Sequence, residues 1–294
     1  MQFLKDTHFK FTDYSTRAVG ISLTVIVIGI ISLLFVRGLN YSIDFTGGTL
    51  AQIKFQREVN ANQIRDALES KGVQKSVVQQ TNRKNEYLIR LPEYSQEGGL
   101  KNKVNQALAS VDPNFKNLET KGVGPQIGEE LRQDAIMAII SALIAIAIYI
   151  AFRFKYYFAL GAVAALVHDV LFTLAIFSFA QFQISISTIA AFLTIVGYSL
   201  NDTIVLYDRI RENMKTSRTF TMKDLIDDSI NQVISRTIIT SLTTFVVVVV
   251  LSFAFGEVKI FAYAMIIGVI TGTFSSIYVA GPILIAWKRK LKSS

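Results

Sequence analysis

The sequence predicts an α-helical polytopic membrane protein with six transmembrane helices and one external α+β ferredoxin-like domain between the first and second helices. Three observations predict this fold class. Of the 294 residues, 51% are hydrophobic and only 18% are charged, which is too apolar for an ordinary soluble protein. Six apolar segments reach the length of about 20 residues that a membrane-crossing helix needs. A more polar stretch, residues 38–132, separates the first apolar segment from the second.

The first span follows an N-terminal segment, residues 1–17, and occupies residues 18–37. Its apolar core is long and no small-residue cleavage site follows it, so we expect an uncleaved anchor rather than a signal peptide. The other five spans lie within residues 133–287, with a loop at 208–232, and a basic tail covers residues 288–294. We place the six apolar cores at Ala18–Val36, Ala135–Phe152, Tyr157–Ala180, Ile184–Tyr207, Val233–Phe255 and Ile260–Trp287.

The distribution of lysine and arginine predicts the orientation of the spans. These residues are concentrated in the N-terminal segment, the connection at 153–155, the loop 208–232 and the C-terminal tail. The short connections on the opposite side hold only Lys259, with Arg37 at the mouth of the first span. By the positive-inside rule, both termini are cytoplasmic and residues 38–132 are extracytoplasmic. The net charge of +8 is therefore mainly a topology signal, and we expect no nucleic-acid binding.

Residues 38–132 show the pattern of an α+β domain. Alternating apolar positions in three segments predict strands, and we add a fourth strand near Phe115–Lys121. Helical spacing in two segments, the first with Asn60 or Asn62 as N-cap and Gly72 as stop, predicts two helices. The resulting order β-α-β-β-α-β is that of a ferredoxin-like domain. The predicted strands are Thr49–Phe55, Val73–Thr81, Glu86–Leu91 and Phe115–Lys121, and the predicted helices are Asn62–Ser70 and Leu100–Ser110.

Asp202 is a carboxyl group in the fourth predicted span, which is otherwise free of charge. A charged residue at the centre of a span costs about 2.5–3.5 kcal/mol on insertion scales, so it faces a bundle interior, a water path or a partner. Ser199, Asn201 and Thr203 surround it with hydroxyl and amide groups. This setting predicts a proton or ion site; the alternative is a structural acid that only fixes packing.

Arg236 enters the fifth predicted span from the same side on which the fourth one ends. Asp202 lies about 9 Å from that end, so the two side chains have similar depths on consecutive antiparallel helices. They are therefore a candidate salt bridge whose partners separate when the aspartate is protonated. The alternative is that Arg236 extends its charge to the membrane surface. Thr237 and the other hydroxyl residues of this span are expected to form interhelical hydrogen bonds.

His168 and Asp169 are adjacent in the third predicted span, past the middle of the membrane. Neighbouring residues on a helix point about 100° apart, so the two side chains face different surroundings. Two titratable groups at this depth are compatible with a proton relay. Equally, Asp169 accepts hydrogen bonds from a neighbouring helix and fixes packing. The sequence leaves both roles open.

Two further patterns concern packing. Gly268 and Gly272 form a small-xxx-small face of the kind that lets helices approach closely. In the loop 208–232, Leu225, Ile226 and Ile230 recur near helical spacing and suggest an interfacial amphipathic helix that leads into the fifth span.

Several classes of site have little support in the sequence. Cysteine is absent, and two histidines with scattered acids leave little for a metal site, so we expect no metal and no cofactor. Gly47 and Gly48 are followed by no nucleotide-binding pattern and predict a tight turn instead. No catalytic triad spacing is recognisable, and we therefore expect that the protein is not an enzyme.

Several motifs together resemble those of a known family. Ser42–Thr49 (SIDFTGGT), which contains Asp44, Phe45, Gly47 and Gly48, resembles the entry to the periplasmic domain of SecF proteins. Val123–Gly128, His168–Asp169, Tyr198–Val205, Asp208–Asn213 and Ser235–Ser241 complete the set in order. The resemblance covers nearly the whole chain.

The resemblance implies a SecF subunit of the SecDF protein-export complex in the RND superfamily. Such a protein uses the proton motive force, or sodium in some members, to assist preprotein export with SecD and the SecYEG translocon. Carried over by position, Asp202 is the intramembrane acid and Arg236 its basic partner, while His168 and Asp169 match a motif of less certain role. The implied partners also include secreted preproteins, membrane lipid and the candidates YajC and YidC. The implied location is the cell inner membrane.

Two other functions remain as alternatives. An RND-type exporter of small molecules would use the same intramembrane acid, but six spans are half of the usual twelve and the external domain is small. A structural scaffold of the translocon would use Asp202 only for packing.

Overall fold

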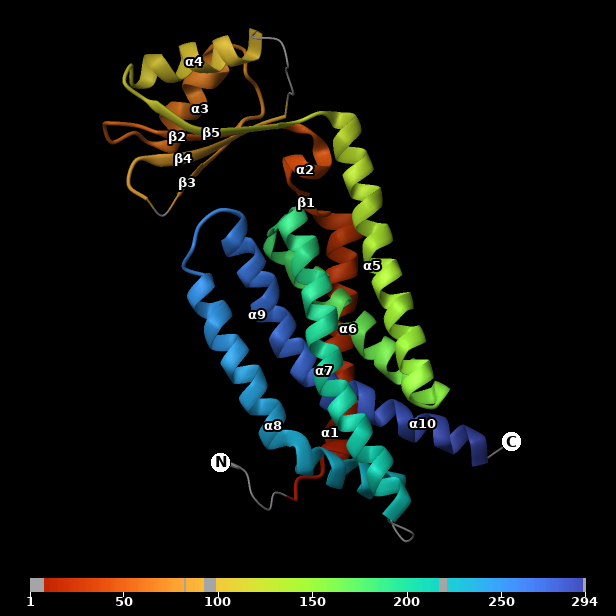
Figure 1. Ribbon diagram of the computed structural model, residues 1–294. Coiled ribbons are helices and arrows are strands. Elements are labelled where there is room, and N and C mark those ends of the chain that lie inside the picture. Colours follow the sequence, from red (N-terminus) through yellow and green to blue (C-terminus); the bar gives the residue numbers. More distant parts are fainter. Residues whose placement is uncertain (1–7, 82, 93–98, 217–220, 293–294) are drawn as a thin grey trace.

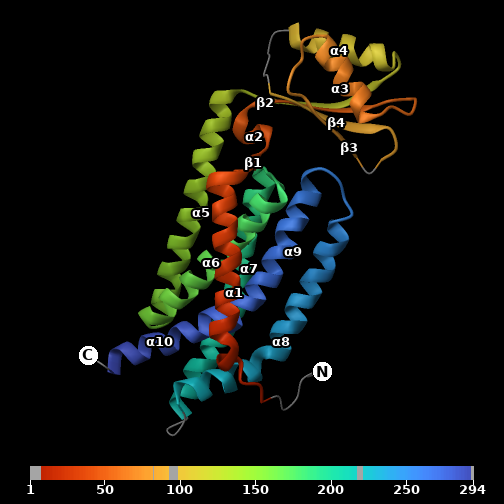
Figure 2. The ribbon, with the colours of Figure 1, turned by 180° about the vertical axis from the view of Figure 1, so that it is seen from behind.

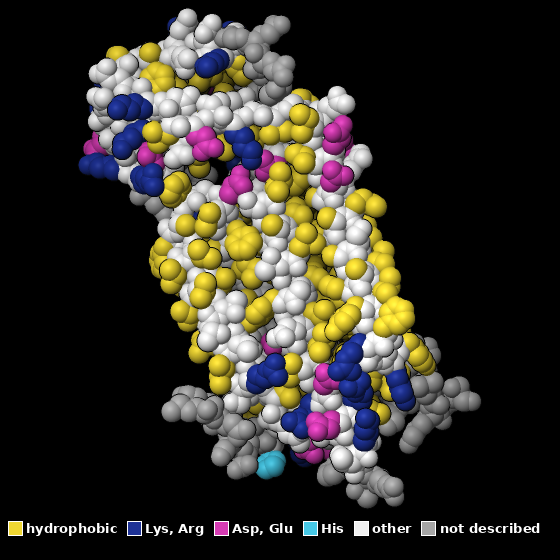
Figure 3. All heavy atoms as spheres, viewed as in Figure 1, with side chains coloured by type: hydrophobic (Ala, Val, Ile, Leu, Met, Phe, Trp, Pro, Cys, Tyr) yellow, Lys and Arg dark blue, Asp and Glu magenta, His cyan; other side chains and the backbone are white. Residues whose placement is uncertain are grey.

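The structure is a computed structural model that describes residues 8–81, 83–92, 99–216 and 221–292. It consists of a bundle of long helices with a small α/β domain at one end (Figure 1). Six helices are long and apolar enough to cross a membrane by length and composition. Hydrophobic side chains cover the sides of the bundle and charged ones gather at its two ends (Figure 3). The protein is therefore a multi-pass membrane protein.

The spans have the predicted number and order, although several begin or end at other residues. Parts of the predicted N-terminal segment, loop and tail lie outside the described residues, namely 1–7, 217–220 and 293–294. The helices of the bundle are α1 (Phe11–Ile31) with the π-helix η1 (Ser32–Val36), α5 (Pro125–Arg153), α6 (Tyr156–Ala180), α7 (Ile186–Thr216), α8 (Met222–Leu251), α9 (Glu257–Ser275), the π-helix η2 (Ser276–Ala280) and α10 (Gly281–Lys292).

The first helix begins at Phe11, before the predicted start at Ala18. Its first turn is capped by a side chain from α8. The carboxylate of Asp227 accepts hydrogen bonds from the backbone N–H of Thr12 at 2.8 Å and from the Thr12 hydroxyl at 2.6 Å. Asn231 also hydrogen-bonds to both backbone groups of Phe9. These contacts satisfy N–H groups that a helix start leaves free, which explains the longer helix.

The prediction of a loop at 208–232 is wrong for most of its length. Helix α7 continues to Thr216, and α8 begins at Met222, so the helix expected around Leu225, Ile226 and Ile230 is the first part of α8 and runs directly into the fifth span. Arg211 pairs with Asp208 at helical spacing, and Thr221 caps α8 by accepting a hydrogen bond from the N–H of Asp224. The charged residues interrupt the apolar pattern but not the helix, because helices extend readily into water beyond the bilayer.

The helix that contains the second predicted span begins before residue 133, where we placed the start of that span. Helix α5 begins at Pro125, where proline suits the first helical position because it lacks an N–H. Gly128 lies against the backbone of Phe45 and Gly47: a Cβ atom built on it would be 3.0 Å from the Gly47 nitrogen. The polar first turns of α5 thus support the segment that precedes the domain.

The last span does not end as a straight helix at Trp287. After η2 the chain bends, and α10 runs outward across the end of the bundle (Figures 1 and 2). Pro282 lacks the N–H that would continue the ladder, so the bend falls at this position. The Tyr207 hydroxyl donates to the Ala280 carbonyl at 3.1 Å and fixes the bend against α7.

Helices α7 and α9 approach closely in the centre of the bundle. A Cβ atom built on Gly268 would lie 2.2 Å from Ile195 Cγ1, and one on Gly272 would lie 3.0 Å from the Cβ of Ser199. Neither position tolerates a side chain without movement of α7. The two glycines are the small face expected from their spacing.

The α/β domain contains one four-stranded antiparallel sheet in the spatial order β3-β4-β2-β5. Helices α3 and α4 cover one face of the sheet (Figure 1). Their core includes the fully buried Ile64, Leu68, Ile89 and Leu108. The elements are β2 (Gly48–Lys54), α3 (Ala61–Ser70), β3 (Val77–Gln80), β4 (Glu86–Leu91), α4 (Gly99–Val111) and β5 (Lys116–Val123).

The second strand is shorter than the predicted Val73–Thr81. Lys75 has a positive φ of 57°, which interrupts an extended chain, so β3 begins at Val77. A short edge strand of this kind offers less backbone for unwanted pairing.

A feature that the sequence did not predict joins the segment before the domain to the bundle. Strand β1 (Asn40–Tyr41) pairs in parallel with β6 (Gln183–Ile184), which lies between α6 and α7. The short helix α2 (Ile43–Thr46) follows β1 and leads into β2. The chain is thereby held at the end of the bundle just before it enters the domain.

The cap on α1 makes a testable prediction about stability. Asp227→Ala removes the acceptor of two buried hydrogen bonds, so we expect the free energy of unfolding to fall by about 1 kcal/mol. Thermal unfolding of the purified protein in detergent measures this loss. Asp228→Ala is the matched control, since no hydrogen bond joins Asp228 to α1 in the described part of the chain. Equal losses in the two variants would contradict the capping role.

Candidate functional site

Asp202 lies on α7 and is 4% exposed, deep among the packed helices. Its carboxylate accepts a long hydrogen bond, 3.5 Å, from the Ser241 hydroxyl on α8. Ser241 in turn shares a short hydrogen bond, 2.6 Å, with the Thr273 hydroxyl on α9. The carboxylate is thus reached by two hydroxyl groups in series from two other helices. A hydrogen bond of this length compensates a buried charge poorly.

Arg236 is not in contact with Asp202. Among the ion pairs between described residues, none joins these two side chains within 4 Å. Arg236 is instead on the exposed face of α8. Its positive charge still acts on the carboxylate at longer range. In this structure Asp202 and Arg236 therefore lie on adjacent helices without forming a salt bridge.

The four supporting polar residues do not form one group. Thr203 and Thr237 are both buried. The Thr203 hydroxyl has no hydrogen-bond partner among the described residues. Asn201 is exposed on the outer face of α7. Ser199 points instead toward Asp169.

Asp169 is a fully buried acid that joins three helices. It is 0% exposed and accepts hydrogen bonds on Oδ2 from the hydroxyls of Ser199 on α7, at 2.6 Å, and Ser275 on α9, at 2.7 Å. On Oδ1 it contacts His168 Nδ1 at 3.0 Å. Three short contacts satisfy this carboxylate far better than Asp202 is satisfied.

His168 has one nitrogen engaged and one free. Its ring is 7% exposed and lies 6.0 Å from the ring of Phe274 on α9, with an interplanar angle of 21°. Nδ1 faces Asp169, whereas the buried Nε2 has no hydrogen-bond partner in the part of the chain that the structure describes. The pair therefore contains an incompletely bonded imidazole beside a satisfied carboxylate.

Ser241, Thr273 and Ser275 were not predicted as members of these sites. Ser241 was expected only to form an interhelical hydrogen bond, and Thr273 and Ser275 were not singled out. Which carboxylate each one meets depends on how α8 and α9 pack against α6 and α7, and one sequence alone does not contain that information.

The residues of the external-domain motif hold the base of the α/β domain. Asp44 in α2 is 1% exposed. Its carboxylate accepts hydrogen bonds from the Ser42 hydroxyl at 2.9 Å and the Ile186 N–H at 3.3 Å, and pairs with the Lys121 ammonium at 2.8 Å. Burial by itself would raise the pKa of Asp44, but these three donors outweigh it and hold the pKa below its ordinary value.

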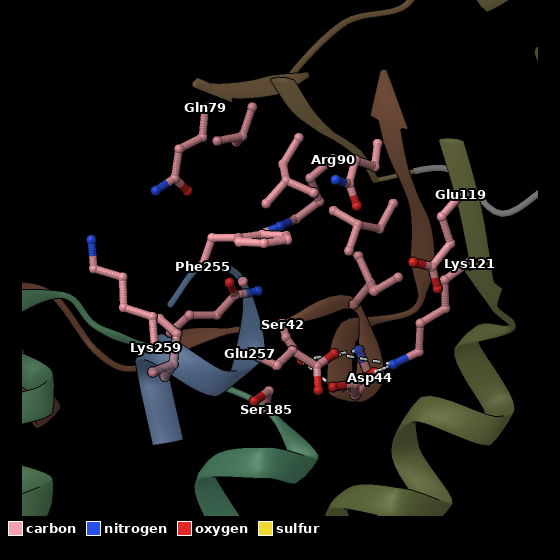
Figure 4. A pocket seen from close by; sticks show the side chains of 18 residues that line it. Ser42, Asp44, Gln79, Arg90, Glu119, Lys121, Ser185, Phe255, Glu257 and Lys259 are labelled. Atoms are coloured by element: carbon pink, nitrogen blue, oxygen red, sulfur yellow. Dashed lines mark hydrogen bonds and ion pairs between the residues drawn. The ribbon is translucent and has the colours of Figure 1, made fainter. Parts of the chain in front are cut away.

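Lys121 extends this ion pair to a third element. Its Nζ lies 3.4 Å from Glu257 Oε1 at the start of α9 (Figure 4). Glu257 Oε2 in turn accepts a 2.5 Å hydrogen bond from Ser187 on α7. Burial would lower the pKa of Lys121, but the two carboxylates raise it. The ion-pair chain Asp44–Lys121–Glu257 thus links β5, α2 and the outer ends of α7 and α9.

Gly47 and Gly48 make the turn from α2 into β2. Both have positive φ, 73° and 125°, which other residues rarely adopt. A Cβ on Gly47 would lie 2.9 Å from Pro125 Cα, and one on Gly48 would lie 2.4 Å from the Leu91 carbonyl oxygen. Phe45 is 6% exposed and packs into the bundle core. The motif is a compact joint that has no room for larger side chains.

No group of three or more His, Cys, Asp or Glu residues within the described ranges is arranged to hold a metal ion. The groups in the bundle that we consider for proton transfer are therefore Asp202, Asp169 and His168.

The fold and these buried acids define a class: polytopic membrane proteins with an α/β domain between the first two spans. The family model "Protein export membrane protein SecD/SecF, C-terminal" matches residues 103–290, and the model "SecD/SecF GG Motif" matches residues 32–59. The chain belongs to the SecD/SecF family. Its function lies in protein export, as the relatives described next indicate.

Protein translocase subunit SecF of Gemmatimonas aurantiaca is 38% identical over 97% of this chain and 89% of its own length. Subunit SecF of Haemophilus influenzae is 39% identical over 92% of this chain and 85% of its length. Protein translocase subunit SecDF of Thermus thermophilus is 40% identical over 99% of this chain, which spans only 40% of that protein.

Two solved structures are also similar. The crystal structure of SecDF from Thermus thermophilus, described as a translocon-associated membrane protein, has a TM-score of 0.87 at 38% identity over 98% of this chain. The crystal structure of SecDF in a super-membrane-facing form has a TM-score of 0.74 at 38% identity over 100% of this chain. The chain spans 40% of the length of each of these SecDF chains.

The ion pair at the base of the domain can be tested by removing its cation. Lys121→Met leaves the Asp44 carboxylate buried with weaker donors, so we expect the free energy of unfolding to fall by about 1–3 kcal/mol. Lys121 is 39% exposed, and solvent screening keeps the loss in the lower part of that range. Thermal unfolding at neutral pH measures it, with Lys116→Met on the same strand as the matched control.

The same variant has an expected pH dependence. Because the pKa of Asp44 is lowered in the folded protein, its ionised form stabilises the fold above the ordinary aspartate value of about 3.9. That contribution is lost as the pH falls through the lower folded pKa. The stability difference between Lys121→Met and the parent should therefore shrink in acid. A difference that stays constant from neutral pH to about pH 2 would contradict the ion pair.

The glycine joint makes a separate prediction. Gly48→Ala introduces a Cβ into contact with the Leu91 carbonyl at a φ that alanine avoids, so we expect a loss of about 1–3 kcal/mol or failure to assemble. Gly20→Ala on α1 has no atom within 4 Å of the new Cβ and serves as the control. Yield and thermal unfolding of the two purified variants provide the measurement. An unaffected Gly48→Ala protein would show that the joint tolerates a side chain.

Proposed function

We propose that this chain is a SecF-type subunit that binds and releases a proton at Asp202 and so couples the proton motive force to preprotein export. The observation that carries this proposal is a buried carboxylate on α7 whose hydrogen bond from Ser241 is long and which forms no ion pair with a cation among the described residues. The Asp202 carboxyl group is held less firmly than that of Asp169, which accepts short hydrogen bonds from Ser199 and Ser275.

The hydroxyl pair beside Asp202 suits both protonation states. A hydroxyl group donates to a carboxylate and accepts from a carboxylic acid. Ser241 therefore remains a partner when the proton arrives, and Thr273 reverses its own hydrogen bond with Ser241. The site changes charge without leaving a buried polar group unpaired.

Arg236 is the second element of the mechanism. When Asp202 is ionised, its charge attracts the guanidinium group on the neighbouring helix, and protonation removes that attraction. The resulting shift of α8 against α7 is the movement that reaches the outer end of the bundle. His168, with its free Nε2, is the candidate next proton carrier, and Asp169 is its positioning residue.

The exposed face of the bundle supports a partner subunit in the membrane. Thr194, Gly197 and Asn201 on α7 and Arg236 and Thr243 on α8 are exposed in the isolated chain. A polar face at this depth is costly in lipid and is suited to helices of another protein. We assign this face to SecD, with SecYEG, YajC and YidC as further members of the assembly.

The remaining topology follows from the same proposal. The protein resides in the inner membrane with both termini cytoplasmic, as the charge distribution favours. The α/β domain lies on the outer side, and its strand order β3-β4-β2-β5 supports a ferredoxin-like fold. The chain acts by binding and movement, without covalent catalysis.

The test is Asp202→Asn in a reconstituted export complex. The substitution keeps the size and polarity of the side chain but removes its titration. We expect ATP-driven translocation and complex assembly to be retained, and the export that depends on the proton gradient to be lost. Asp208→Asn is the matched control, because Asp208 pairs with Arg211 and is partly exposed near the end of α7.

Two outcomes would contradict the proposal. Export by Asp202→Asn that still responds to the proton gradient would exclude Asp202 as the coupling acid. A response to a sodium gradient alone in the parent complex would show that the coupled ion is not the proton.

A further inference from the structure

The sheet of the α/β domain has one face that no helix covers. Side chains alternate along each strand, so α3 and α4 cover every second residue and leave the others free. Cross-strand pairing arranges the free ones in two rows across the four strands. One row is Val77, Arg90, Leu50 and Lys121, and the other is Gln79, Leu88, Gln52 and Glu119.

This uncovered face is the roof of a cavity of about 530 Å³ above the helix bundle. Its lining is completed by Ser42, Asp44 and Ser185, by Phe255 in the connection between α8 and α9, and by Lys259 in the first turn of α9 (Figure 4). The hollow is visible between the domain and the bundle in Figure 3. The volume lies in the range of pockets that bind ligands, about 300–1,000 Å³.

The lining carries positive and negative side chains in equal number, so it favours neither an anionic nor a cationic ligand. Arg90, Lys121 and Lys259 are matched in number by Asp44, Glu119 and Glu257. Leucine, valine and glutamine side chains lie between them in both rows. Amide groups donate and accept hydrogen bonds, as do the amides of a polypeptide backbone.

Arg90 has unused hydrogen-bonding capacity in this cavity. Its Nε is buried and has no hydrogen-bond partner among the described residues, and burial lowers the pKa of its guanidinium group. A buried donor without a partner is costly and is satisfied by an acceptor from a ligand. A backbone carbonyl or a side-chain carboxylate of a peptide supplies such an acceptor.

The free edge of strand β3 favours an extended peptide as the ligand. It lies at the edge of the sheet, pairs only with β4 within the described part of the sheet, and Val77 is 51% exposed. The backbone of an edge strand offers N–H and C=O groups that an extended peptide can pair with. The four residues of β3 span about 13 Å at 3.3 Å per residue. A lipid headgroup has no comparable use for this row of groups.

We propose that an extended segment of the exported polypeptide pairs along the free edge of β3, so that every second side chain of that segment faces the cavity between β3-β4-β2-β5 and the helix bundle. This inference rests on the proposed function in protein export and adds the place where the substrate touches this chain. Pairing through the backbone makes binding tolerant of the substrate sequence, and the balanced charges exclude neither acidic nor basic segments.

The absence of cysteine from the sequence permits a direct test. In membrane vesicles with the complete export complex, Gln79→Cys places a thiol in the cavity. Gln106→Cys, an exposed glutamine on α4, places one on the covered side of the domain. A preprotein with one cysteine is arrested during export, and disulfide formation is induced. We expect the preprotein to form a disulfide-linked adduct with the Gln79→Cys variant and no adduct with the Gln106→Cys variant.

A second variant tests binding without a cross-link. Leu88→Glu changes the uncovered face and leaves the helix-covered core intact, so we expect reduced export with normal complex assembly. Equal adducts at both positions, or export unaffected by Leu88→Glu, would overturn the inference. Labelling of Gln79→Cys by a photoreactive phospholipid, but not by preprotein, would assign the cavity to lipid and overturn it as well.

The result is separable from the test of Asp202. An adduct at Gln79→Cys together with normal gradient-dependent export by Asp202→Asn would retain the cavity and reject the proton site. Loss of gradient-dependent export by Asp202→Asn without an adduct at Gln79→Cys would retain the proton site and reject the cavity.

Discussion

The close approach of α7 and α9 is the constraint on which the centre of the bundle depends. Two glycines on α9 let its backbone approach Ile195 and Ser199 on α7 to a distance that no side chain would permit. That approach brings the Ser199 and Ser275 hydroxyls onto one oxygen of Asp169. Because lipid supplies no hydrogen bonds, a fully buried acid at this position requires both donors. The close packing of α7 and α9 is therefore also what supplies the hydrogen bonds that Asp169 requires.

The same packing leaves the two intramembrane acids in different states of satisfaction. Asp169 has three short contacts, at 2.6, 2.7 and 3.0 Å, whereas the hydrogen bond from Ser241 to Asp202 is long, at 3.5 Å. Both are buried, so the difference comes from the number of donors, not from depth. An acid with few donors responds to protonation by changing its partners, and an acid with many holds its neighbours in place. This contrast is the physical basis for assigning coupling to Asp202 and positioning to Asp169.

The α/β domain meets the bundle through a small and rigid base. Two adjacent strands, β2 and β5, enter and leave it, and the Gly47–Gly48 turn fixes the point of entry. The ion-pair chain Asp44–Lys121–Glu257 connects that base to the outer ends of α7 and α9. These helices also carry Asp202, Ser199, Thr273 and Ser275. A change in their packing within the membrane therefore has a short route to the domain and to the cavity beneath its sheet.

The sequence by itself determined the number and order of the spans, the α/β element order and the intramembrane acids, because hydrophobic length and periodicity are local properties. It misplaced the ends of α5, α7 and α8, where charged or polar residues continue a helix into water. It also grouped Ser199 with Asp202 by proximity along the chain. Tertiary structure alone decided that Ser199 belongs to Asp169, that Arg236 stands apart from Asp202, and that the uncovered sheet face closes a cavity. Each of these depends on the rotation of one element against another, which sequence spacing does not specify.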